Sequence, residues 1–149
     1  MGGVLKKSKR LGPVKQIAEN NETAAAMKMN QSLQAQQESL AQLKKLKEYR
    51  NDYTVQFKTK GQVGMSASRL REYQEFVQKL DQAIEEHSKT VQSLQEKLGQ
   101  HQQAFKKTNS RKKVVEKLIE KSKQHELRET GRLEQNESDD RMVKGFELD

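Results

Sequence analysis

The sequence predicts an all-α protein: a long antiparallel two-helix coiled-coil hairpin with an overhanging C-terminal helix and disordered termini. Helix-favouring Gln, Glu, Lys, Arg, Leu and Ala are abundant in the 149 residues, and Pro13 is the only proline. Hydrophobic residues make up 32%, below the roughly 45–50% typical of compact domains, so a disordered chain is the alternative. An apolar seam with a 3.5-residue period in the second half favours the coiled coil.

Breaker residues divide the chain. Pro13 suits the first turn of a helix, where its missing N–H has no intrahelical partner. No further glycine or proline occurs before Gly61, where two glycines and two serines lie within eight residues. Ser66 or Ser68 can cap the helix that follows. We therefore expect a basic flexible N-terminus over 1–12, the hairpin over 13–135 with its turn at about 60–67, and an acidic flexible tail over 136–149.

The second helix has the clearest periodicity. Its apolar positions alternate at spacings of three and four residues, which is the pattern of a coiled-coil seam. The pattern contains Leu70, Tyr73, Val77, Leu80, Ile84, His87, Val91, Leu94, Leu98, His101 and Phe105, and extends to Thr108, Lys112, Val115 and Ile119.

The first helix is less regular. Its expected seam is Val14, Ile17, Ala24, Met27, Leu33, Leu40, Leu43, Leu46, Tyr49, Tyr53 and Phe57. A short turn makes two such helices antiparallel neighbours. Centring the turn near Gln62 places Val14 opposite about residue 110, so the second helix is expected to overhang beyond that point.

The net charge of +8 is unevenly distributed. The first fifteen residues carry +5 and residues 106–123 carry +6, whereas residues 131–149 carry −3. A basic chain can bind nucleic acid, anionic lipid or an acidic protein, although basic helix surface can also be merely solvated. Aromatic residues do not alternate with the basic blocks, so a single-strand stacking surface is not supported, and non-specific phosphate binding stays open.

No pattern of a catalytic or metal site occurs. The chain has no cysteine, which excludes disulfides and thiolate chemistry, and its three histidines do not have ligand spacing. Neither a phosphate-binding loop nor a dinucleotide fingerprint is present. We therefore expect no enzyme activity, cofactor or metal. No apolar run approaches the roughly 20 residues of a membrane span, and the N-terminus does not resemble a secretory signal.

Two four-residue sets near the turn share the offsets i, i+4, i+7 and i+11. Each set forms one stripe on its helix, and the stripes lie at similar distances from the turn. One interpretation is a bulkier seam near the turn; the other is a docking surface, since Tyr and Phe are typical anchors. The sets are Gln42, Leu46, Tyr49 and Tyr53, and Phe76, Leu80, Ala83 and His87.

The segment that contains both stripes resembles the flagellar FliJ family of bacteria. The resemblance depends on QLKKLKEYRNDY from Gln42 and on GMSASRLREYQEFVQKLDQAIEEH from Gly64. It covers about 46 residues and is accompanied by the chain length and the position of the turn. It implies a soluble, non-enzymatic component of the flagellar type III export apparatus, located in the cytoplasm and peripherally at the cytoplasmic face of the inner membrane.

The resemblance also implies partners and site residues. The expected partners are the export ATPase, whose ring assembly the family promotes, the membrane-embedded export gate protein FlhA, and export chaperones. Family gate contacts fall on all eight residues of the two stripes, and each carries the family's residue type. For the ATPase, analogy with a rotary stalk indicates the helix ends, here Val14, Ile17, Arg111, Lys112, Val115 and Ile119.

Other functions remain open from the sequence alone. A structural coiled-coil spacer, a basic rod associated with nucleic acid, and a holding chaperone would have the same composition. The resemblance itself predicts no specific nucleic acid. Salt dependence separates these functions, because phosphate-driven binding weakens steeply with salt and apolar docking does not.

Overall fold

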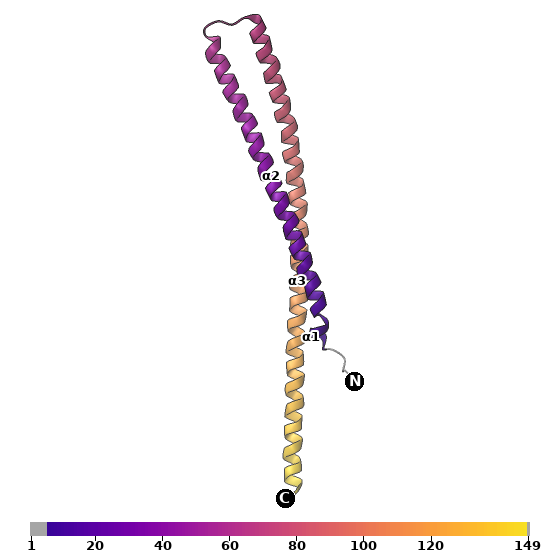
Figure 1. Ribbon diagram of the computed structural model, residues 1–149. Helices are drawn as coiled ribbons and strands as arrows, with labels where there is room; N and C mark the ends of the chain where they lie inside the picture. Colours follow the sequence, from indigo (N-terminus) through magenta and orange to yellow (C-terminus); the bar gives the residue numbers. More distant parts are fainter. Residues whose placement is uncertain (1–5, 149) are drawn as a thin grey trace. The chain divides into compact units, whose positions relative to one another are not determined.

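The computed structural model describes residues 6–148, with side chains as far as Gly145, and every regular element in that range is an α-helix. The elements are α1 (Lys7–Arg10), α2 (Gly12–Gly61) and α3 (Ala67–Leu148) (Figure 1). The predicted all-α class with two long helices is therefore confirmed. Residues 1–5 of the expected flexible N-terminus, and Asp149, lie outside the described residues.

The turn between α2 and α3 consists of residues 62–66, within the interval expected from the sequence. Gly64 has a φ of 97°, a conformation that residues with a side chain rarely adopt. Its N–H donates to the carbonyl oxygen of Gly61 at 3.2 Å. Of the two candidate caps, Ser66 takes the role: its Oγ accepts a hydrogen bond from the N–H of Arg69 at 3.2 Å.

The chain divides into two compact units, and each is described by itself. The turn unit comprises residues 26–104 and contains the turn with the adjoining parts of α2 and α3. The terminal unit comprises the described parts of 1–25 and 105–149. In both units the α2-side segment and the α3 segment are antiparallel neighbours (Figure 1).

The seam of α3 agrees with the predicted spacing. Every predicted position from Tyr73 to Ile119 is buried or half-buried, with Val91 and Leu98 only 7% exposed and Ile119 9%. Leu70 is the exception, at 45% exposure. The alternation of three and four continues past Ile119, where the predicted pattern ends, to buried Ser122 and half-buried Glu126.

The seam predicted for the first helix is wrong in its N-terminal half. Near the turn, Leu43, Leu46, Tyr53 and Phe57 lie in the seam as expected, but Val14, Ile17, Ala24, Met27, Leu33, Leu40 and Tyr49 are exposed. The apolar residues of this half do not follow the 3.5-residue period of the bulky residues nearer the turn. Apart from Met29, small and polar residues occupy the seam instead: Ala18, Glu22, Ala25, Ser32, Gln36 and Ser39.

The expected overhang beginning at residue 111 is also wrong. Within the terminal unit, Glu22 contacts Asn109 and Lys112, and Ser8 contacts Glu126, so residues 111–126 have neighbours from the start of the chain. Residue 22, rather than residue 14, lies opposite 109–112. The expected pairing depends on a turn centred at Gln62 and on a first helix that begins at Pro13. The turn in fact consists of residues 62–66, and residues 7–10 also form a helical turn.

Beyond Glu126 the helix is solvated. Every described side chain from Leu127 to Gly145 is exposed, so the predicted overhang exists but begins later. The sequence analysis expects an irregular tail from 136, whereas α3 continues to Leu148. Glu, Gln, Arg and Met are good helix formers, and no proline interrupts them. No side chain of 127–145 is buried. The flexibility expected for the acidic tail over 136–149 stays a prediction.

Among the described helices, none is both long enough and apolar enough to cross a membrane.

Candidate functional site

The two aromatic stripes predicted from spacing converge in the turn unit. We call the surface formed by their eight residues the aromatic edge: Gln42, Leu46, Tyr49 and Tyr53 on α2, and Phe76, Leu80, Ala83 and His87 on α3. Rings from both helices meet there. Tyr53 and Phe76 have centroids 4.5 Å apart, and Tyr49 approaches Phe76 edge-on at 6.3 Å. The two stripes therefore form one surface.

Half of the aromatic edge belongs to the seam and half flanks it. Leu46, Tyr53, Leu80 and His87 follow the 3–4 alternation and are half-buried. The flanking positions are Gln42, Tyr49, Phe76 and Ala83. Each directly precedes a buried or half-buried residue along the chain. Tyr49 is 53% exposed, which is high for a side chain that already contacts two other rings. The aromatic edge therefore contains both side chains that pack in the seam and side chains that flank it.

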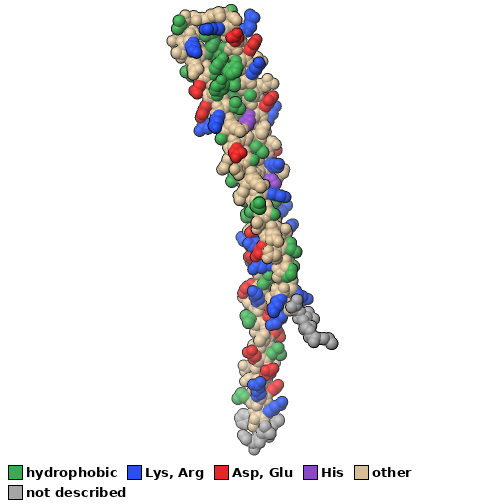
Figure 2. Space-filling view, viewed as in Figure 1, with side chains coloured by type: hydrophobic (Ala, Val, Ile, Leu, Met, Phe, Trp, Pro, Cys, Tyr) green, Lys and Arg blue, Asp and Glu red, His purple; other side chains and the backbone are tan. Residues whose placement is uncertain are grey.

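The aromatic cluster continues toward the turn. Phe57 and Tyr73 stack with centroids 3.5 Å apart, and Tyr73 stacks on Tyr53 at 5.6 Å. Five of the seven aromatic residues of the chain therefore lie in one cluster. Figure 2 shows hydrophobic side chains gathered near the turn, at the top of the view. The sequence analysis assigned Phe57 and Tyr73 only to the seam, although their closeness in sequence to the stripes was a usable signal.

A groove of about 430 Å³ adjoins the aromatic edge, lined by Gln42, Lys45, Leu46, Tyr49 and His87. His87 is held in place from α2: its Nε2 lies 2.8 Å from the Ser39 carbonyl oxygen and 3.2 Å from Ser39 Oγ. Because a carbonyl oxygen only accepts hydrogen bonds, Nε2 carries the proton and donates to it. This bond fixes the imidazole at the floor of the groove.

An ion pair joins the two helices in the same unit. The Arg50 guanidinium donates to both carboxylate oxygens of Asp81, with Nη2 3.2 Å from Oδ2. The hydrogen bond from Arg50 lowers the pKa of Asp81, and the same bond raises the pKa of Arg50. A bidentate pair of this kind fixes register more than it adds stability, since both side chains are more than a third exposed.

The terminal unit contains the residues predicted to contact the ATPase, but they do not form one surface. Val14 and Ile17 are 44% and 60% exposed, and Arg111 is exposed as well. Val115 is half-buried and Ile119 buried, so both pack the hairpin.

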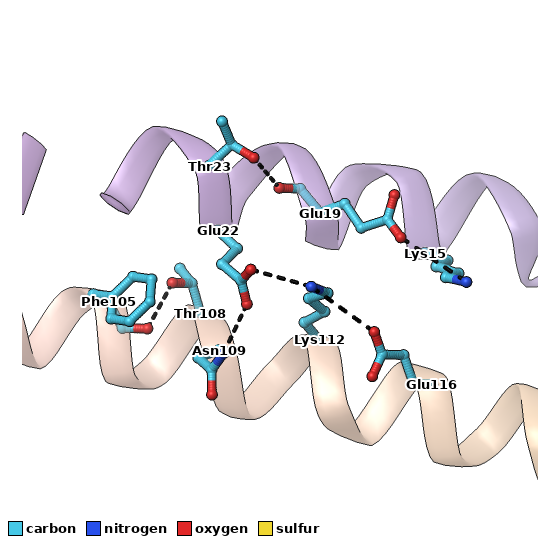
Figure 3. A network of polar contacts seen from close by, with 9 residues as sticks. All are labelled: Lys15, Glu19, Glu22, Thr23, Phe105, Thr108, Asn109, Lys112 and Glu116. Atoms are coloured by element: carbon cyan, nitrogen blue, oxygen red, sulfur yellow. Dashed lines mark hydrogen bonds and ion pairs between the residues drawn. The ribbon is translucent and has the colours of Figure 1, made fainter. Parts of the chain in front are cut away.

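Lys112 belongs to a polar network inside the terminal unit (Figure 3). Its Nζ lies 3.1 Å from Glu22 Oε1, and Asn109 Nδ2 donates to Glu22 Oε2 at 2.8 Å. Hydrogen bonds from Asn109 and Lys112 lower the pKa of Glu22, and the bond to Glu22 raises the pKa of Lys112. The sequence assigned this lysine to a partner, whereas the structure gives it a structural neighbour.

A second set of polar contacts in the terminal unit joins Ser8 to Glu126 on α3. The Ser8 hydroxyl is 2.7 Å from Glu126 Oε2, and the Ser8 N–H donates to Oε1 at 3.1 Å. The hydrogen bonds from Ser8 lower the pKa of Glu126. Hydrogen bonds of the carboxylates Glu22 and Glu126 thus connect residues 8 and 22 to α3 within the terminal unit.

Within the described residues, no group of three or more His, Cys, Asp or Glu side chains is arranged to hold a metal ion. The histidines occupy separate positions: His87 and His101 are half-buried along the α3 seam, and His125 is exposed. What the site offers chemically is therefore a partly exposed aromatic surface in the turn unit and a basic surface in the terminal unit.

The fold and these surfaces define a class: all-α helical hairpin proteins with a partly exposed aromatic cluster beside the turn. The chain belongs to the family described as Flagellar FliJ protein, whose model matches residues 7–146. It is 25% identical over 130 residues to the Flagellar FliJ protein of Escherichia coli (strain K12), covering 87% of this chain and 88% of that protein. The Flagellar FliJ protein of Salmonella typhi matches with the same identity and coverage. No solved structure shows a significant match.

The predicted family resemblance is therefore confirmed, and the match extends well beyond the 46 residues that suggested it. Membership points to a component of the flagellar protein export apparatus.

Proposed function

We propose that this protein is a non-enzymatic component of the flagellar export apparatus that contacts the membrane-embedded export gate protein FlhA through the aromatic edge. The observation that supports this is the convergence of eight residues from two helices on one edge, with Tyr49 left 53% exposed. Partly exposed aromatic side chains beside a groove are the usual anchors of protein interfaces. The protein acts in the cytoplasm and reaches the membrane peripherally through the gate.

The test compares two residues of equal exposure on different faces of α2. Tyr49 and Val55 are each 53% exposed, but only Tyr49 lies on the aromatic edge. In a host lacking its own copy, Tyr49→Ala should abolish swimming and weaken capture of the gate protein at least ten-fold, while Val55→Ala should change neither. Far-UV circular dichroism should stay helical for both.

Loss of helicity in Tyr49→Ala would assign the residue to hairpin packing and remove the docking proposal. Equal losses with Val55→Ala would show that α2 is sensitive to any truncation, and the edge would have no special role.

Contact with the export ATPase is assigned to the terminal unit. Its support is a basic surface, with eight basic and two acidic residues over 106–123, beside exposed apolar side chains. The exposed apolar residues are Val14 and Ile17, together with Val114 and Leu118. The last two are 56% and 43% exposed and are not among the residues predicted from the sequence. Arg111 is exposed, whereas Lys112, Val115 and Ile119 act by holding the unit together.

Ile17→Asp tests the ATPase contact because the side chain is 60% exposed and its replacement costs the fold little. We expect weaker stimulation of ATPase ring assembly, measured by light scattering or native mass spectrometry, with unchanged gate binding. Unchanged ring assembly would contradict the assignment. Escort of export chaperones belongs to the same proposal, and a pull-down with empty chaperones checks it.

A basic rod that binds nucleic acid is the second candidate, supported by the charge of the terminal unit. Binding of that kind falls steeply between about 50 and 200 mM salt, because counterions are released from phosphates. Retention of gate and ATPase binding over that range favours the export function.

A further inference from the structure

The apex of the turn carries an apolar side chain that the aromatic edge does not use. Val63 is 90% exposed, the highest value among the large hydrophobic residues of the described chain. It lies between Gly61 and Gly64, in the five-residue segment that joins α2 to α3. A single exposed valine is ordinary on a protein surface, so its meaning depends on what surrounds it.

Its surroundings are mostly basic, with Asp52 and Glu72 as the first acidic residues on either side. From Tyr53 to Arg71 the chain has four basic residues and no acidic residue. Two precede the turn and two follow it, and all four are exposed. None of them forms an ion pair with another residue that the structure describes. The four are Lys58, Lys60, Arg69 and Arg71.

Aromatic rings stand directly behind this apex. A hollow of about 280 Å³ is lined by Tyr53, Phe57, Tyr73 and Met65, and its charged lining residues are Lys60, Arg69 and Glu72. Aromatic rings with a polar end are favoured at the headgroup level of a membrane, because one part of the ring is apolar and the other is polar. The turn therefore presents an apolar tip, then a basic ring, then aromatic residues.

We propose that the apex of the turn contacts an anionic phospholipid surface, with Val63 entering the headgroup boundary and the four basic side chains facing lipid phosphates. Clusters of four or more Lys and Arg beside an apolar contact have this affinity for anionic leaflets. With one apolar residue and four charges, the contact orients the protein at the membrane and does not anchor it.

This inference goes beyond the gate proposal, because its partner is lipid and its residues are not those of the aromatic edge. The experiments below measure vesicle binding through residues outside the aromatic edge, so their failure leaves the gate proposal intact.

The first experiment uses the absence of cysteine in the native chain. Val63→Cys gives a single labelling site for an environment-sensitive dye at the apex. Gln102→Cys is the matched control, because this residue is exposed on α3 within the same turn unit. With vesicles of 70% phosphatidylcholine and 30% phosphatidylglycerol, the label at 63 should shift to the blue and the label at 102 should not. Phosphatidylcholine alone should give no shift.

Equal shifts at both sites, or none at 63, would overturn the proposal. So would a shift at 63 that is produced by the soluble part of the gate protein and not by vesicles, since the occupant would then be an acidic protein surface.

The second experiment reverses the charge of exposed basic residues. Lys60→Glu with Arg69→Glu changes the apex by −4, and Lys106→Glu with Lys107→Glu makes the same change in the terminal unit. All four side chains are exposed, so both variants should remain helical. In co-sedimentation with the anionic vesicles at 100 mM salt, the apex pair should weaken partitioning at least five-fold and the control pair less than two-fold. Equal weakening by both pairs would mean a general effect of positive charge and would overturn the assignment to the turn.

Discussion

Ser32 and Ser39 occupy equivalent seam positions on α2, seven residues apart, and both are buried at 8% and 6% exposure. Their hydroxyl groups differ in partners. Ser39 Oγ lies 3.2 Å from His87 Nε2, whereas Ser32 Oγ has no hydrogen-bond partner among the described residues. A buried hydroxyl without a partner loses its hydration without compensation, so these two serines should contribute to stability with opposite sign.

Replacing each serine by alanine tests this difference. Ser39→Ala should lower the free energy of unfolding by about 0.5 kcal/mol, because Ser39 Oγ is lost as the second acceptor of the His87 Nε2 proton while the carbonyl oxygen keeps its bond. Ser32→Ala should leave it unchanged or raise it by up to about 1 kcal/mol, because an unpaired hydroxyl is removed. Urea unfolding followed by circular dichroism measures both. Equal losses in the two variants would contradict the different environments of the hydroxyls.

The carboxylates of the terminal unit make stability depend on pH. Hydrogen bonds to Glu22 and Glu126 lower their pKa values below the ordinary 4.5. A carboxyl whose folded pKa is lowered stabilises the fold above its ordinary pKa, and this contribution is lost as the pH falls through the lowered value. Melting temperature should therefore decline from pH 5 toward pH 2, and Glu22→Gln should reduce the decline.

Glu96→Gln is the control for that experiment, because Glu96 is exposed on α3 and forms no ion pair in the described structure. A decline that is the same in both variants and in the native chain would contradict the role of the Glu22 network.

At alkaline pH the dependence of stability on pH has the opposite sign for Lys112. Its raised pKa means that its contribution is present below the ordinary value and is lost as the pH rises through the raised one.

At the scale of elements, the two long helices contribute unequally to the core. Among the described side chains, four hydrophobic residues are buried: Val91, Leu98 and Ile119 are on α3, and Leu43 is on α2. From residue 18 to 39 the α2 seam is mostly Ala, Ser, Gln and Glu. This half of α2 has good helix formers but little apolar surface to bury, so α3 and the residues near the turn determine the pairing.

This asymmetry explains what the sequence could predict. On α3 the apolar residues and the seam coincide from Tyr73 to Leu98, so spacing predicted the buried face correctly. On the first half of α2 the apolar residues lie outside the seam, and counting them gave the wrong face. Pairing register depends on where the turn is centred, which a pattern within one helix does not determine.

Leu43→Ala and Leu40→Ala measure the difference between seam and surface on α2. Leu43 is 9% exposed and Leu40 is 45% exposed, three residues apart. Leu43→Ala should lower the free energy of unfolding by about 2 kcal/mol or more, because a buried side chain is lost. Leu40→Ala should change it by less than about 0.5 kcal/mol. Equal effects in urea titrations would show that Leu40 also packs in the hairpin.

The final part of α3 contributes helix without tertiary packing. A chain ending at Thr130 should lose helical signal in proportion to the residues removed and keep its melting temperature, because no described side chain from Leu127 to Gly145 is buried. A fall in melting temperature would show that the tail packs on the rest of the chain.

At the scale of the whole molecule, the two units carry different surfaces. The turn unit has the aromatic edge and the basic apex, and the terminal unit has the basic stretch over 106–123 with exposed Val14 and Ile17. A protein with two unlike surfaces suits a role in which it contacts two unlike partners, as proposed for the gate and the ATPase.

The candidate site could be predicted from sequence only in part. The offsets i, i+4, i+7 and i+11 predicted two stripes whose rings meet at Tyr49, Tyr53 and Phe76. Each stripe alternates between flanking and seam positions, and the docking role of the eight residues stays a prediction. Spacing alone could not separate packing from docking, because Tyr53 belongs to the seam and Tyr49 does not. The approach of Tyr49 to Phe76 across the two helices required the structure.

Photo-crosslinking in motile cells tests the central claim most directly. A benzophenone amino acid is placed at Tyr49 on the aromatic edge or at Val55 on another face of α2, since the two residues are equally exposed. We expect a crosslink from position 49 to the export gate protein and none from position 55. A crosslink of equal yield from both positions, or none to the gate protein from position 49, would contradict it.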